Sequence, residues 1–205
     1  MLNAYFHTLS LHPQAAQLQQ VLGLYEATDS QSLAADMAYH PLAQHLGALV
    51  LDDTDTSNHH LLATQGPLAG HVVYLSHDGD SRAVFANWAD WLQAAERALQ
   101  QGCDVAELHP AHAPIAPDQG ALAAALQALV AADASEAAIA LLPSLDLTAP
   151  RHAALLQAWA VDDDFYLGEA LALQIALRPD ARLQALAERC AAHPHPQVVQ
   201  AGHSA

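Results

Sequence analysis

The chain has 205 residues, of which 53% are hydrophobic, and a formal net charge of −16 from 22 acidic residues, six arginines and no lysine. Affinity for phosphate backbones and anionic membranes comes mainly from Lys and Arg, so we expect neither nucleic acid nor a membrane as a partner. An acidic surface favours a basic protein partner, although solubility alone would also explain the charge. The partner expected from charge is therefore a basic protein.

The sequence carries no signal for export. Residues 1–7 lack the basic-then-apolar pattern of a signal peptide, and no apolar run approaches the roughly 20 residues that span a bilayer. Cys103 and Cys190 show no spacing typical of a disulfide framework. We therefore expect a cytoplasmic protein with both thiols reduced.

Two helices are expected near the N-terminus. Apolar residues at helical spacing predict a helix over residues 14–25, with Gly23 near its end. Residues 28–30 offer caps for a second helix over residues 33–39, which Pro41 should interrupt or end.

The middle of the chain changes to strand patterns. Strands are expected at residues 48–51, 59–64, 71–76 and 82–85, separated by polar or Gly-rich turns. Asp78-Gly79 is typical of a tight hairpin turn. Asn87 can cap a following helix, whose face with Trp88 and Trp91 should pack on the sheet.

This middle segment resembles a known family. The order is a strand, Asp-Asp-Thr-x-Thr-Ser-Asn, a strand, Gly-Pro-Leu-Ala-Gly, then Val-Val-Tyr-Leu-Ser-His-Asp-Gly-Asp-Ser-Arg-x-Val-Phe and a helix. Over about Leu49–Leu99 it is similar to the SMI1/KNR4 (SUKH) family. The resemblance implies an α+β domain with a small, mostly antiparallel sheet and a protein-binding surface, and it carries over no catalytic residue. Bacterial members of the family often act as immunity proteins, and others are interaction scaffolds.

Helical patterns dominate the second half. We expect an SMI1/KNR4-like domain over residues 1–108, a Pro-rich linker over residues 109–117 and an α-helical region over residues 118–205. Five short helices with polar or Pro-containing breaks are typical of a HEAT-like fragment, and a plain helical bundle fits equally well.

The spacing of the potentially reactive residues gives little support for a catalytic, metal or cofactor site. His59, His60, His71, His77 and Asp78 could supply a metal site or an acid/base pair, yet no helical HxxxH or HExxH pattern is present. No nucleophile elbow and no Gly-rich phosphate motif occurs either. We therefore expect a non-enzyme without metal or cofactor.

The candidate contact residues are acidic groups on loops. They are Asp52, Asp53 and Asp55 after the first strand, Asp78 and Asp80 at the hairpin, and Asp162, Asp163 and Asp164 before Phe165-Tyr166. The first two groups are expected to be exposed, although turn chemistry explains any single Asp there. A helix N-terminus with buried aromatics is the alternative for the third group.

Three functions remain open at this point. The first and favoured one is a bacterial immunity protein that binds and neutralises a cognate, basic toxin. The second is an adaptor or scaffold, and the third is a small enzyme that uses the histidine-rich loops. The sequence gives neither the partner nor the oligomeric state.

Overall fold

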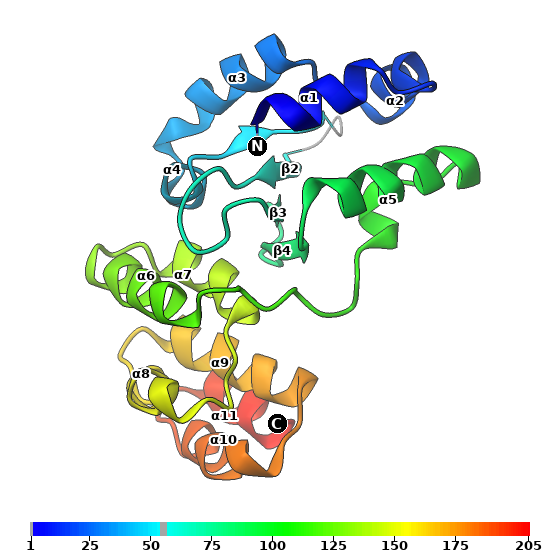
Figure 1. Ribbon diagram of the computed structural model, residues 1–205. Coiled ribbons are helices and arrows are strands. Elements are labelled where there is room, and N and C mark those ends of the chain that lie inside the picture. Colours follow the sequence, from blue (N-terminus) through cyan, green and yellow to red (C-terminus); the bar gives the residue numbers. More distant parts are fainter. Residues whose placement is uncertain (1, 54–56) are drawn as a thin grey trace. The chain divides into compact units, whose positions relative to one another are not determined.

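The structure is a computed structural model that describes residues 2–53 and 57–205, and Figure 1 shows the arrangement of its elements. The chain forms two compact units, residues 1–117 and 118–205. The segment 109–117, expected to be a linker, belongs to the first unit. Eleven α-helices and one four-stranded antiparallel sheet lie in the described part, which confirms a mixed helix and sheet protein.

Five α-helices belong to the first unit. They are α1 (Leu2–Ser10), α2 (Ala15–Leu22), α3 (Ala27–Asp36), α4 (Pro41–Leu46) and α5 (Trp88–Gln101), with short 3₁₀ turns η1 (Met37–Tyr39) and η2 (Val105–Leu108). The helix expected over residues 14–25 is confirmed in shorter form as α2, and α1 was not predicted. The helix expected over residues 33–39 begins earlier, at Ala27, so the caps expected at residues 28–30 lie inside α3. Pro41 starts α4 rather than only ending a helix, because the first helical position needs no backbone N–H donor.

The sheet is a meander in the order β1-β2-β3-β4. Its strands are β1 (Leu49–Val50), β2 (His59–Leu62), β3 (Val72–Leu75) and β4 (Arg82–Phe85), which confirms the four expected strands in shorter form. All three pairings are antiparallel, and a register shift lies between Val72 and Val73. The strands therefore alternate in direction, so every second connection lies at the same end of the sheet.

The core of the first unit lies between one face of the sheet and the helices α1, α2 and α5. Trp91 is fully buried there, and its ring contacts those of Tyr5 and His60. Trp88 is only partly buried and packs at the margin against Tyr5. The expected Asn87 cap is confirmed, because its side chain accepts a hydrogen bond from the Asp90 backbone N–H at 2.9 Å.

The second unit is helical throughout. It contains α6 (Gln119–Ala131), α7 (Ser135–Leu141), α8 (Ala153–Trp159), α9 (Phe165–Leu177), α10 (Gln184–Ala191) and α11 (Pro196–His203), with 3₁₀ turns η3 (Leu142–Ser144), η4 (Pro150–His152) and η5 (Ala181–Leu183). Five helices were expected. The sixth, α11, was not predicted, and Pro196 occupies its first turn, where proline is tolerated.

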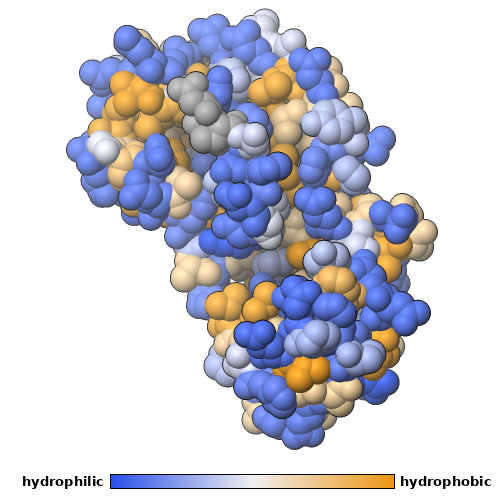
Figure 2. Space-filling view, turned by 180° about the vertical axis from the view of Figure 1, so that it is seen from behind, coloured by the Kyte–Doolittle hydropathy of each residue, from blue (hydrophilic) through white to orange (hydrophobic). Residues whose placement is uncertain are grey.

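No helix in the described ranges has the length and apolar character needed to cross a bilayer. The face of the molecule drawn in Figure 2 is largely hydrophilic, and hydrophobic residues on it form small separate groups.

Candidate functional site: the acidic end of the sheet

Two acidic connections lie at the same end of the sheet. β1 runs toward residues 51–53 and β2 returns from residues 57–58, while β3 runs toward residues 76–81 and β4 returns. The two connections are joined directly, because the His77 backbone N–H donates to Asn58 Oδ1 at 2.7 Å. We call this region the acidic sheet end; its charged residues are Asp52, Asp53, Asp78, Asp80 and Asp104.

A pocket of about 270 Å³ opens at the acidic sheet end. Its polar lining comes from the β1–β2 connection, from β2 and β3, and from the loop before η2, while α2 and η2 supply apolar walls. The lining residues are Val21, Leu22, Asp52, Asp53, Asn58, His60, Tyr74, Asp104, Val105 and Ala106. Three carboxylates thus border one small cavity.

A buried chain of polar side chains lies beside this pocket. Asp52 accepts two hydrogen bonds from His60, one from the backbone N–H at 2.8 Å and one at the Nδ1 atom at 2.5 Å. His60 Nε2 lies 2.7 Å from His109 Nε2. Asp52 and His60 are each only 1% exposed. The chain therefore connects the end of β1, the start of β2 and the segment that follows η2.

The geometry determines which nitrogen carries each proton when both rings are neutral. His60 Nδ1 carries the proton that it donates to the Asp52 carboxylate, so its Nε2 is an acceptor. His109 must then donate from Nε2. A second proton between the two Nε2 atoms would place two N–H groups face to face, so this contact holds only one proton.

Burial keeps His109 in its neutral form. The pKa of His109 is lowered to about 3, first because burial removes water from the ring and then because a proton on His109 would be repelled by a proton on His60 and by the charge of Arg82. The segment that carries His109 is also held by a hydrogen bond from Arg82 Nη2 to the Pro110 carbonyl at 2.8 Å.

The Asp52–His60–His109 chain positions a segment and orients one imidazole. An Asp–His pair supports nucleophilic catalysis when a hydroxyl or thiol occupies the position next to the second ring nitrogen. Here His109 occupies that position. Within the described ranges, no group of three or more His, Cys, Asp or Glu side chains is arranged to hold a metal ion.

The carboxylates at the acidic sheet end contribute to raised pKa values of two nearby tyrosines. The pKa of Tyr74 is raised by burial and then by the charges of Asp80, Asp52 and Asp78, against an opposing hydrogen bond from Asn58. The pKa of Tyr25 is raised by burial and then by Asp53. Carboxylates from both connections therefore act on the same small region.

The expected contact residues differ in their surroundings. Asp53, Asp78 and Asp80 are exposed, as expected. The exposure expected for Asp52 is wrong, because its carboxylate is buried as the acceptor for His60. Asp55 lies outside the described residues.

Two residues of the site were missed by the sequence reasoning. Asp104 follows the C-terminal end of α5, and His109 lies in the segment expected to be a linker. Asp104 and Glu107 form a capping box at the start of η2, a local signal for a helix start that does not indicate a pocket, and His109 has no local motif. His71 and His77, the histidines considered for catalysis, flank opposite ends of β3 and are not brought together.

The third acidic group lies in the second unit and starts α9. Asp164 caps this helix by accepting from the Tyr166 N–H at 3.2 Å, and Asp162 accepts from the Asp164 N–H. Phe165 stacks on His195, whereas Tyr166 is 56% exposed. Asp163 is exposed. The group thus combines a helix N-terminus with one exposed aromatic ring.

Replacing His109 with Gln should change the pH dependence of stability. The folded-state pKa of about 3 lies below the usual value of 6.5, so the unfolded chain takes up a proton that the folded chain does not. The stability contributed by the neutral ring is full above pH 6.5 and is lost as pH falls toward 3. Between pH 7 and pH 4.5 the native chain should lose about 1–2 kcal/mol more than His109→Gln, after allowance for partial exposure of the ring.

Urea unfolding at several pH values measures this difference. His112→Gln is the matched control, because His112 is exposed on the same segment and should leave the pH profile unchanged. Parallel stability profiles of the native chain and His109→Gln would contradict the prediction.

Comparisons with known protein families, with curated proteins and with solved structures give no match to this chain.

Proposed function

We propose that the chain is a protein-binding module that holds a basic partner protein at the acidic sheet end. Its role in this proposal is that of a bacterial immunity protein of the SMI1/KNR4 type, which neutralises a cognate toxin in the cytoplasm by covering a basic surface that the toxin needs. The observation that carries the proposal is the convergence of two acidic connections and a carboxylate-lined pocket at one end of the sheet.

The charge distribution supports a basic partner. Residues 1–117 contain twelve acidic residues but only two arginines, Arg82 and Arg97. Arg82 lies half-buried, and one of its guanidinium nitrogens donates to a backbone carbonyl. Such a surface accelerates the encounter with a positively charged protein and disfavours acidic ones.

The pocket suits a long cationic side chain of that partner. Its volume of about 270 Å³ is at the lower limit of ordinary ligand cavities, and its border combines carboxylates with apolar walls. An Arg or Lys side chain can place its apolar stem against Val21 and Val105 and its charge near Asp53 and Asp104.

Binding to the product of the adjacent gene, where that gene encodes a toxin domain, tests the proposal. Neutralising Asp53, Asp78 and Asp80 together as Asn should weaken the complex roughly 10–100-fold, mainly through slower association. The effect should shrink as salt is added, because these charges are exposed. Calorimetry and stopped-flow kinetics would measure affinity and association rate, and survival of cells that express the toxin would report protection.

A matched control removes three exposed charges elsewhere. The variant Asp36→Asn, Asp133→Asn, Glu136→Gln has the same net charge as the first variant but leaves the acidic sheet end intact. It should bind almost as tightly as the native chain. Equal weakening by both variants would show that only net charge matters, and a lack of binding by the native chain would refute the proposed role.

A further inference from the structure

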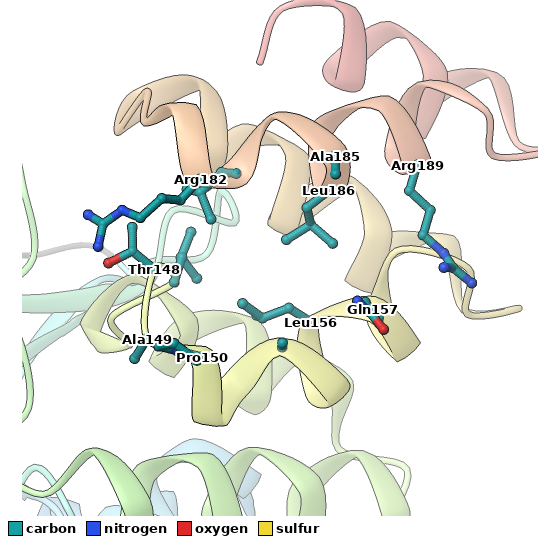
Figure 3. A pocket seen from close by; sticks show the side chains of 12 residues that line it. Thr148, Ala149, Pro150, Leu156, Gln157, Arg182, Ala185, Leu186 and Arg189 are labelled. Atoms are coloured by element: carbon teal, nitrogen blue, oxygen red, sulfur yellow. The ribbon is translucent and has the colours of Figure 1, made fainter.

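The second unit contains a groove of about 400 Å³. It is lined by Leu147, Thr148, Ala149, Pro150, Ala153, Leu156, Gln157, Arg182, Leu183, Ala185, Leu186 and Arg189. One wall comes from η4 and α8, and the other comes from η5 and α10 (Figure 3). The groove thus separates two helical segments within a single unit.

The wall formed by η5 and α10 carries a charge at each end. Ala185, Leu186 and Arg189 lie on α10, and Arg182 lies in the 3₁₀ turn η5 that leads into this helix. In Figure 3 Leu186 points toward Leu156 of the opposite wall, and the two arginines lie on either side of this pair. The apolar centre is therefore flanked by two guanidinium groups.

Small side chains keep the groove open. Ala153 on α8 and Ala185 on α10 are both exposed, so a third helix can approach both backbones closely. The buried floor includes Leu156 and Leu183. Amphipathic helices bind to grooves of this kind through apolar residues one turn apart.

The two arginines differ in how much charge they offer. Arg182 forms two hydrogen bonds with the Asp180 carboxylate, at 2.9 and 2.7 Å, so its position is fixed and its charge is partly neutralised. In the described part of the chain, no carboxylate forms an ion pair with Arg189. Arg189 is exposed and remains available to an incoming anion.

We propose that the α8–α10 groove binds an acidic amphipathic helix of a partner protein, with apolar side chains packed on Ala153, Ala185 and Leu186 and carboxylates at Arg182 and Arg189. Charge complementarity selects this occupant, because two of only six arginines in a chain of net charge −16 lie at the ends of an apolar groove. The two arginines are seven residues apart, which is about two helical turns. The matching helix therefore carries two carboxylates about two turns apart.

This groove is independent of the basic partner proposed above and has the opposite charge preference. An adaptor needs two such distinct surfaces, so the groove favours a scaffold as the second candidate function.

A designed peptide tests the groove on the full chain. The probe is a capped, fluorescently labelled helix with two glutamates two turns apart and two leucines between them, and the control peptide has glutamines in place of the glutamates. Anisotropy should show saturable binding of the probe and at least tenfold weaker binding of the control. Amide shifts on binding should fall in residues 147–157 and 182–189.

Charge reversal on the protein identifies the surface. Arg189→Glu should weaken binding of the glutamate peptide at least tenfold, whereas Arg97→Glu, an equal charge change on exposed α5, should have little effect. No binding of the glutamate peptide, or equal loss in both variants, would overturn the proposal. Two other results would also overturn it: self-association in sedimentation that Arg189→Glu abolishes, or saturable binding of decanoate where the peptide fails to bind.

Discussion

Replacing Asp52 with Ala should destabilise the first unit by about 3–4 kcal/mol, as measured by urea unfolding. The Asp52 carboxylate accepts hydrogen bonds from the backbone N–H and from Nδ1 of His60, and both residues are only 1% exposed. Its removal leaves two buried donors without an acceptor and removes the negative charge beside the imidazole. A buried donor without an acceptor costs more free energy than the hydrogen bond itself contributes to stability.

Asp53→Ala is the matched control for Asp52. Asp53 is the next residue, carries the same charge and is exposed at the same pocket. Its loss should change stability by less than about 1 kcal/mol while weakening partner binding. Equal effects of the two substitutions on stability would show that the Asp52–His60–His109 chain does not support the fold.

Gly23→Ala should destabilise the first unit by about 3 kcal/mol or more. Gly23 ends α2 with φ +65°, and a Cβ atom there would lie 2.0 Å from the Asp53 carbonyl oxygen. The Gly23 carbonyl also accepts a hydrogen bond from the Asp53 N–H at 2.9 Å, so the two backbones cannot separate without losing this bond. The substitution should also displace Asp53 and so weaken binding at the acidic sheet end.

Gly102→Ala is the matched control for Gly23→Ala, because it has a similar positive φ angle but no atom close to the added Cβ atom. Gly102 ends α5 with φ +67°, but no atom lies within 4 Å of the position that a Cβ would occupy. Ala at this position should cost only about 1 kcal/mol, the usual cost of a positive φ angle. Thermal and urea unfolding of both variants would measure the difference, and similar losses would contradict the role assigned to the Gly23–Asp53 approach.

The segment that follows α2 holds the start of the β1–β2 connection in place. Tyr25 N–H donates to the Leu51 carbonyl, and Leu24 forms an isolated bridge with Asp52. The chain after α2 thereby fixes the residues that leave β1. Asp52 is turned into the core, where it orients His60, and the next residue, Asp53, is exposed.

Several local elements followed from the sequence alone. The β-branched and aromatic run at residues 71–76 predicted β3, and the Asn87 cap with tryptophans at helical spacing predicted α5. Local propensity and periodicity were sufficient because each signal lies within a few neighbouring residues. The N-terminal α1 and the C-terminal α11 were not predicted, and in α11 Pro196 stands in the first turn, where proline is compatible with a helix although it interrupts one elsewhere.

The sequence by itself determined the acidic charge, the strand and turn pattern, and the exposed carboxylates of Asp53, Asp78 and Asp80. Only the tertiary structure decided that Asp52 is buried and that His60 meets His109, because these rings lie 49 residues apart in the sequence. It also decided that α8 and α10 form a groove between two arginines. Contacts between distant segments depend on how whole elements pack, and neither residue spacing nor local propensity records that packing.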